Sequence, residues 1–332
     1  ACATACVGAA TTLTSSARAD GYRPPELGWG YGEIEGARSL AMGGAVRALG
    51  MSTSSITANP ANLALQRVYH LEALGTYDTG AHELRYGAGV LDSYTSRLAM
   101  GVMAAQTNEG IGDAVSRDGL DVHVAIGVPL ADKVAFGVAG RYLRVNQTGV
   151  GPLNESTPVA NAGGDPSNFT GYTFDAGLSF GIGEVLHLAA VGYNLSNPST
   201  SLAPLMVGGG LGVQTPVASI EADMLGVDRS SWGTWKARLQ IGGELLAGGK
   251  FPLRLGYSWD QSSQRHAISG GVGYIDKQYA MDLGLRQEIA APSDGWGKAT
   301  VMTVSLRYFY ESATPMGPTD GPGALPQELT PQ

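Results

Sequence analysis

Apolar and polar residues alternate along this chain with a period of two, and the alternation recurs about fourteen times between Gln66 and Tyr310. In the plainest example, 120–128, leucine, valine and isoleucine occupy every second position, and the positions between them are small or polar. A β-strand places alternate side chains on opposite faces, so the pattern predicts strands with one apolar face. Three further stretches show the same scheme clearly: 172–180, 235–241 and 251–259.

A soluble two-sheet sandwich and a closed membrane barrel both show such alternation. Two details favour the membrane barrel. The apolar stretches run for roughly nine to eleven residues, which is the length that a tilted strand needs to cross a bilayer. Aromatic residues bracket several stretches, as Phe251 and Trp259 do, and this is typical of interfacial girdles. The pattern therefore predicts an all-β fold, a transmembrane antiparallel β-barrel.

We expect fourteen strands, an even number as in bacterial single-chain barrels. Tight connections such as 129–133 alternate with mostly longer ones such as 107–118 and 147–168. Short periplasmic turns and long extracellular loops are typical of outer-membrane barrels. The predicted strands are 66–77, 83–91, 97–106, 119–129, 133–146, 170–181, 185–195, 202–213, 217–226, 234–246, 251–259, 265–275, 279–288 and 300–310.

Charged side chains of both signs fall on the predicted inner face in nearly equal numbers. A pore selective for one ion sign would carry a biased set, whereas mixed charges favour ion pairs packed against an internal plug. The candidate plug, or hatch, is the segment 20–65 before the first strand. The predicted lumen charges, with one histidine among them, are Glu72, Arg85, Asp121, His123, Arg141, Asp175, Glu221, Asp223, Lys236, Arg238, Glu244, Arg254, Asp282, Arg286 and Arg307.

Composition narrows the function classes. Acidic residues exceed basic ones by 29 to 21, which argues against a nucleic-acid partner. No run of about 18 apolar residues predicts a transmembrane helix. The five histidines lack the spacing of a metal site, and no nucleophile lies beside a base in the pattern of a hydrolase. We therefore expect no metal, no cofactor and no enzyme activity.

The first nineteen residues are rich in alanine and threonine and end in Ala-Arg-Ala before Asp20. This resembles the end of a secretory signal peptide, and a disordered terminus is the alternative. Both cysteines, Cys2 and Cys6, lie there, so we expect a mature chain without disulfides.

The predicted organisation is a signal-peptide remnant at 1–19, a hatch at 20–65, a barrel at 66–310 and a disordered periplasmic tail at 311–332, which is rich in proline and glycine. The tail is either an inert extension or a tether that binds a partner.

Within the predicted hatch, a Gly-Ala-Arg run and a Met-Gly-Gly-Ala run are followed, after a spacer, by an Asn-Pro-Ala box that opens onto the first strand. This order and spacing resemble the N-terminal signature of the FadL-type transporters of hydrophobic compounds, a family that includes PorV-like outer-membrane proteins. The resemblance implies a 14-stranded barrel with an N-terminal hatch inside the lumen. The motif residues are Gly36, Ala37, Arg38, Met42, Gly43, Gly44, Asn59, Pro60 and Ala61.

The resemblance also implies a function: passive uptake of hydrophobic, fatty-acid-like small molecules across the outer membrane of a Gram-negative bacterium. Its signature would be an apolar pocket between hatch and wall, and purely structural plugging by the motif is the alternative for these residues. The candidate ligand-lining residues are Trp29, Tyr31, Leu40, Met42 and Met103.

The alternative function is a PorV-like closed barrel that serves as an anchor or adaptor in a cell-surface, secretion or motility complex. Compact loops and a charged lumen favour it. Under both hypotheses the barrel contacts outer-membrane lipid and lipopolysaccharide; the second adds a protein partner bound through the extracellular loops or the C-terminal tail.

The eighth predicted strand carries a candidate weak point in the wall. Proline and consecutive glycines weaken a strand, and a kink there would open the barrel laterally to lipid. Unbroken hydrogen bonding to both neighbouring strands would contradict this hypothesis. The residues concerned are Pro204, Gly208, Gly209 and Gly210.

Overall fold

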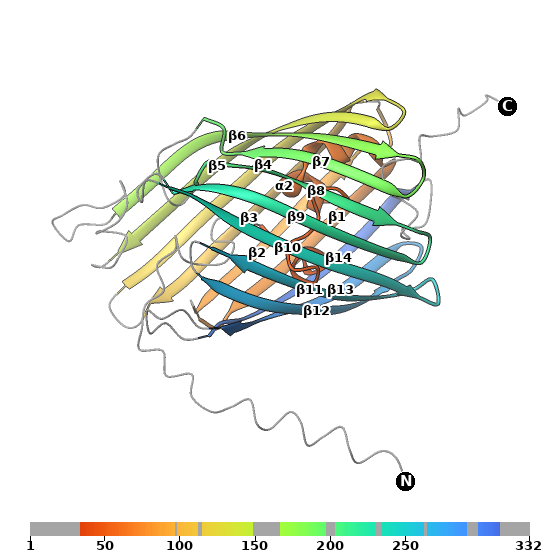
Figure 1. Ribbon diagram of the computed structural model, residues 1–332. Coiled ribbons are helices and arrows are strands. Elements are labelled where there is room, and N and C mark those ends of the chain that lie inside the picture. The colour runs from red at the N-terminus through yellow and green to blue at the C-terminus, as the bar shows by residue number, and fades with distance from the viewer. Residues whose placement is uncertain are drawn as a thin grey trace, which may run out of the picture.

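The chain forms a closed barrel of fourteen antiparallel strands (Figure 1). The computed structural model describes residues 34–80, 82–96, 98–111, 115–148, 167–196, 203–229, 234–261, 264–290 and 298–312. Each strand pairs with its neighbours in sequence, and β1 closes the ring against β14. The strands are β1 Val68–Asp78, β2 Glu83–Asp92, β3 Ala99–Ile111, β4 Val115–Ala131, β5 Val134–Thr148, β6 Ser167–Ile182, β7 Leu186–Tyr193, β8 Met206–Gln214, β9 Ala218–Arg229, β10 Thr234–Ala247, β11 Phe251–Asp260, β12 Arg265–Ile275, β13 Tyr279–Ala290 and β14 Thr300–Ser312.

The fold class and the strand number predicted from the sequence are confirmed. Trp29 and Tyr31, the predicted signal segment 1–19 and the chain from 313 on lie outside the described residues. The predicted domain boundaries therefore stay predictions.

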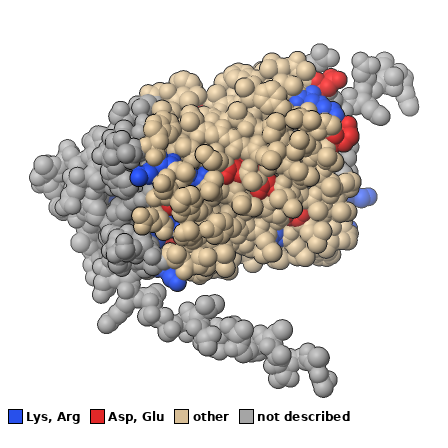
Figure 2. Space-filling model, in the orientation of Figure 1, with Lys and Arg blue, Asp and Glu red and all other residues tan. Residues whose placement is uncertain are grey.

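The outer face carries the large apolar side chains of the alternating pattern. Val124, Phe174 and Leu255 are 46%, 49% and 75% exposed. In Figure 2 most of the described surface between the two ends of the barrel carries no charged side chain. An apolar surface is favourable against lipid and unfavourable against water, so this is a membrane-facing surface. No helix in the described ranges is long and apolar enough to span a membrane.

Tight turns join the strands at one end of the barrel, and salt bridges link neighbouring turns. Lys133, after β4, lies 2.8 Å from Glu184, after β6, and Lys250 lies 3.5 Å from Asp276. The hydrogen bond from Lys133 lowers the pKa of the exposed Glu184 carboxyl. Such exposed pairs contribute little to stability.

The predicted long loop at 107–118 is wrong, because β3 and β4 continue through most of it. Their pairing extends past Thr107↔Gly119 to Ile111↔Val115. Arg117 Nη1 donates to Glu109 Oε2 at 2.7 Å on the inner side of the ladder. Beyond the apolar belt a strand no longer needs apolar residues on its outer face, so the sequence pattern ends before the strand does.

The predicted kink in the eighth strand is also contradicted. β8 pairs with β7 from Met206 to Val213 and with β9 over its whole length, in both cases without a register shift. The glycines allow close packing instead: a Cβ on Gly210 would overlap the Asp223 carboxylate, and one on Gly208 would overlap the backbone of β9. None of the four predicted residues interrupts the pairing: Pro204, which precedes β8, and Gly208, Gly209 and Gly210.

Residues 34–67, which we call the inner segment, lie within the barrel before the first strand; Figure 1 shows their helices, orange, surrounded by strands. The segment contains α1 Ala37–Ala41, α2 Ser54–Ala58 and the 3₁₀-helix η2 Pro60–Leu65. Asn59 caps η2, because its side-chain oxygen accepts from Ala61 N at 3.1 Å, and Pro60 occupies the first helical position, where no N–H is needed. The inner segment therefore defines the space in which a ligand could be held.

Candidate functional site

A row of glycines in the wall receives the Asn-Pro-Ala box of the inner segment. Gly127, Gly137 and Gly177 lie side by side on β4, β5 and β6. A Cβ on Gly137 would overlap Pro60, and one on Gly177 would overlap the Asn59 side chain. We call these three residues the first glycine row. Their missing side chains let the 3₁₀-helix lie directly on the wall.

A second glycine row receives α1 and the Met-Gly-Gly run. It consists of Gly242, Gly256, Gly271 and Gly284, on β10 to β13. A Cβ on Gly256 would overlap the Met42–Gly43 backbone, and one on Gly271 would overlap the Ala41 side chain. Gly43 and Gly44 themselves adopt positive φ angles of 68° and 86°, which disfavour other residues there. The motif glycines thus serve a tight turn against the wall.

The Asn59 side chain forms hydrogen bonds both within the inner segment and with the barrel wall. Its Nδ2 donates to the carbonyl oxygen of Arg47 at 2.8 Å and to Ser179 Oγ on β6 at 2.9 Å. Ser179 Oγ in turn donates to Asn62 Oδ1 at 2.5 Å. All the side chains concerned are buried. The amide of Asn59 thus donates and accepts at once, which a carboxylate or an ammonium group could not do.

Two carboxylates of β9 hold the backbone between α1 and α2. Asp223 Oδ2 accepts from the N–H groups of Val46 and Arg47 at 3.0 and 3.2 Å. Glu221 accepts from Ala48 and Leu49 at 2.5 and 3.1 Å. Consecutive N–H groups that converge on carboxylates form strong, charge-assisted hydrogen bonds. The four amides from 46 to 49 are therefore fixed to the wall.

An ion-pair network continues this attachment along the wall from β10 to β14. Arg38 of α1 lies 3.2 Å from Glu244, which also accepts from Arg254 at 2.5 Å. Arg254 and Arg307 both pair with Asp282. All five side chains are buried, so removal of one partner would leave an uncompensated charge.

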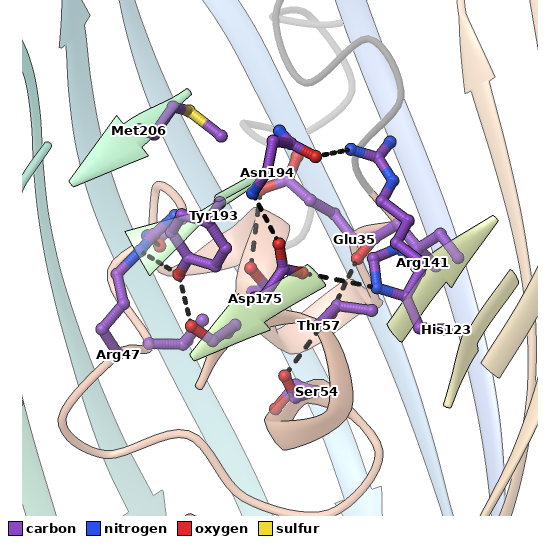
Figure 3. Close-up of a pocket in the computed structure, with 15 residues that line it drawn as sticks. Glu35, Arg47, Ser54, Thr57, His123, Arg141, Asp175, Tyr193, Asn194 and Met206 are labelled. Atoms are coloured by element: carbon purple, nitrogen blue, oxygen red, sulfur yellow. Dashed lines mark hydrogen bonds and ion pairs between the residues drawn. The ribbon is translucent and has the colours of Figure 1, made fainter. Parts of the chain in front are cut away.

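The larger of two cavities lined by described residues lies between the inner segment and the wall of β4 to β8 (Figure 3). Its enclosed space is about 50 Å³, and all non-atom space including its open side comes to about 590 Å³. The enclosed part holds about three or four water molecules and is smaller than the roughly 150 Å³ of a cavity that binds benzene. Described residues that line it include Ile34, Glu35, Val46, Arg47, Ser54, Thr57, Ala58, His123, Arg141, Asp175, Tyr193, Asn194 and Met206.

The arginines at this cavity are already engaged by carboxylates. Arg141 holds Asp121 through two hydrogen bonds, of 3.0 and 2.8 Å, and donates to Asn194 Oδ1 at 3.0 Å. Arg47 lies 3.3 Å from Asp223 and donates to the Tyr193 hydroxyl at 3.2 Å. The guanidinium groups thus organise the wall of the cavity.

The second cavity encloses about 20 Å³. Ile34, Ser39 of α1, and Ser54 and Thr57 of α2 line both cavities. Ser54 and Thr57 are half-buried, whereas every residue of α1 is buried. Of the two helices that border both spaces, α2 is therefore the less buried.

The candidate ligand-lining residues do not come together at one place. Leu40 and Met42 are fully buried, and Met42 packs on the second glycine row. Met103 lines the second cavity, and Trp29 and Tyr31 lie outside the described residues. Their role as ligand contacts stays a prediction.

The predicted lumen charges all lie on inward-facing positions, and all are buried except Lys236, which is half-buried. Sequence reasoning placed His123 and Asp175 on the inner face but missed Tyr193 and Asn194. Tyr193 occupies an inward position of β7, and this parity is the signal that could have indicated it. No group of three metal-ligating side chains occurs among the described residues.

The sequence matches no protein-family model and no curated protein, whereas solved structures share its fold. The Ralstonia pickettii toluene transporter TbuX superimposes with a TM-score of 0.61 at 15% identity, over 84% of this chain and 98% of that one. A Pseudomonas aeruginosa FadL homologue gives 0.61 at 12%, over 83% and 98%. The CymD monoaromatic hydrocarbon channel gives 0.63 at 13%, over 83% and 97%. The fold that the hatch motif implied, that of the FadL-type hydrophobic-compound transporters, is thereby the fold of this chain.

Proposed function

We propose that the protein is a passive route for hydrophobic small molecules across the outer membrane of a Gram-negative bacterium. The observation that carries the proposal is the pair of cavities between the inner segment and the wall, in a barrel whose fold is shared with a toluene transporter and a monoaromatic hydrocarbon channel. Burial of apolar surface provides the driving force, and no energy input is needed.

Passage requires a rearrangement of the inner segment, because the enclosed parts of the cavities, about 50 and 20 Å³, are too small for a hydrocarbon ring. α1 is fixed by the second glycine row, and residues 46–49 are fixed by the carboxylates of β9. α2 is the less buried element and lines both cavities. A displacement of α2 would join them, so we assign the gate to this helix.

Uptake into intact Gram-negative cells tests the proposal, since the lipopolysaccharide layer is the barrier that such a protein would bypass. Cells with and without the protein receive labelled toluene and, as a control, a labelled polar solute of similar size. We expect a severalfold faster initial entry of toluene and no change for the polar solute. Equal toluene entry in both cells would contradict the proposal.

The comparisons do not favour the alternative, an anchor or adaptor barrel. It becomes the conclusion if toluene entry is unchanged and a second protein co-purifies with the barrel in mild detergent. Buried ion pairs that hold an inner segment in place are compatible with both functions, so only the uptake measurement separates them.

A further inference from the structure

Asp175, which lines the larger cavity, differs from the other carboxylates near it. Asp121, Asp223 and Glu35 each lie within ion-pair distance of an arginine. Within the described part of the chain, Asp175 has no arginine or lysine at that distance, although it is only 3% exposed. Its Oδ1 accepts the Asn194 N–H at 2.7 Å. Its Oδ2 faces the cavity, which leaves an acceptor available there.

The neighbouring His123 is also buried and also has hydrogen-bonding capacity left over. His123 is 4% exposed, and neither of its ring nitrogens has a well-aligned hydrogen bond. Nδ1 lies 3.8 Å from Asp175 Oδ2, and Nε2 lies 3.1 Å from Asp121 Oδ1. Figure 3 shows the His123 ring and the Asp175 carboxylate facing each other at the cavity. The gap of 3.8 Å is too wide for a direct hydrogen bond, and a small polar group that contacts both side chains would satisfy them.

The charges around the cavity exclude an anionic group. A carboxylate ligand would approach Asp175 and Glu35, while Arg141 and Arg47 already hold Asp121 and Asp223. Like charges at such distances repel strongly where water is excluded. A bare hydrocarbon is also disfavoured, because it would displace water from Asp175 and His123 without replacing the hydrogen bonds.

Part of the remaining wall is apolar. Ile34, Val46, Ala58 and Met206 line the same cavity, and they offer contact to the body of an amphipathic compound. The enclosed space of about 50 Å³ accommodates a head group, and the open side leaves room for the body.

We propose that this cavity binds an apolar compound through a hydrogen-bond-donating head, an alcohol, a phenol or an amine, with Asp175 as the acceptor. The inference rests on the proposed function, since it names the class of compound that the barrel carries. His123 positions the head beside Asp175.

Calorimetric titration of the purified barrel in mild detergent tests this with four compounds that share one ring: benzyl alcohol, benzylamine, benzoate and toluene. We expect the alcohol and the amine to bind at least tenfold more tightly than benzoate and toluene. The substitution Asp175→Asn should remove this preference while the affinity for toluene stays within twofold. His123→Phe should weaken binding of the alcohol about fivefold.

Thr303→Val is the control, because it removes a buried hydroxyl of β14 that does not line the cavity. Equal binding of all four compounds, tightest binding of benzoate, or no binding at all would overturn the inference. If a variant does not fold, the relative affinities of the unsubstituted protein for the four compounds still test the inference. Toluene entry into cells is measured independently, so the proposed function can stand when this inference fails.

Discussion

Single glycines decide where the inner segment lies. Gly137 faces the lumen, and a side chain there would overlap the Pro60 carbonyl group and the Ala61 amide. Gly140 on the same strand has no atom within 4 Å of a Cβ position. Substituting each residue in turn therefore separates the effect of replacing a glycine from the effect of blocking the contact with the inner segment.

We predict that Gly137→Leu displaces η2 and opens a conducting path, because backbone atoms of the inner segment cannot yield as a flexible side chain can. Conductance of the purified barrel in planar bilayers should rise severalfold above that of the unchanged protein. Gly140→Leu should leave it unchanged. Equal conductance of the two variants would show that the first glycine row does not control the position of η2.

At Asn59 the prediction concerns local stability. Asn59→Ala removes the hydrogen bonds to Arg47 O and Ser179 Oγ and the cap of η2. Buried partners left without a hydrogen bond cost roughly 2 kcal/mol in local opening free energy. Hydrogen exchange at the amides of 61–65 should accelerate about thirtyfold. Asn146→Ala, which removes a hydrogen bond to Asp118 far along the chain, should leave their exchange rates as they are.

At the scale of the element, β9 acts on the inner segment through alternate residues. Glu221 and Asp223 occupy successive inward positions, and the amides that they accept from are more than 170 residues away in sequence, with a separation of 177 for Asp223 and Val46. Alternation predicts that both carboxylates face the lumen. It cannot predict their partners, because these depend on how the inner segment lies against the wall.

The double variant Glu221→Gln, Asp223→Asn should loosen residues 46–49 specifically. Amides cannot match the charge-assisted hydrogen bonds of carboxylates, so we predict at least tenfold faster hydrogen exchange at these amides, with no change in β11 to β13. Glu184→Gln, in an exposed turn, serves as the control. Unchanged exchange at 46–49 in the double variant would mean that the two carboxylates of β9 do not hold these residues.

At the scale of the whole molecule, lipid on one face explains what the sequence could predict. Val124, Phe174 and Leu255 had to be apolar because they face the membrane, and their spacing revealed the strands. At the outer ends of β3 and β4 this requirement ceases, and there the prediction of a loop was wrong. The glycines of β8 suggested a kink, but they allow close approach in an unbroken strand.

For the interior, the sequence predicted which side chains face inward but not which of them are in contact. The contact of Arg38 with Glu244 joins residues 206 apart, and the cavity combines His123, Asp175 and Tyr193 from three strands. Strand parity gives the face on which a residue lies. Its height in the barrel depends on register and tilt, which the sequence does not express, and so the cavity itself could not be foreseen.

The most direct test of a transport route past α2 is to block the route with a bulky side chain. Thr57 lines both cavities, whereas Thr170 is exposed on the outside of β6, so Thr57→Trp and Thr170→Trp add the same bulk in different places. Both variants are first checked for the heat-dependent gel mobility of a folded barrel, and initial entry of a labelled apolar compound into intact cells is then measured. We predict that Thr57→Trp reduces protein-dependent entry at least tenfold while Thr170→Trp retains it. Full entry through folded Thr57→Trp would contradict a route past this helix.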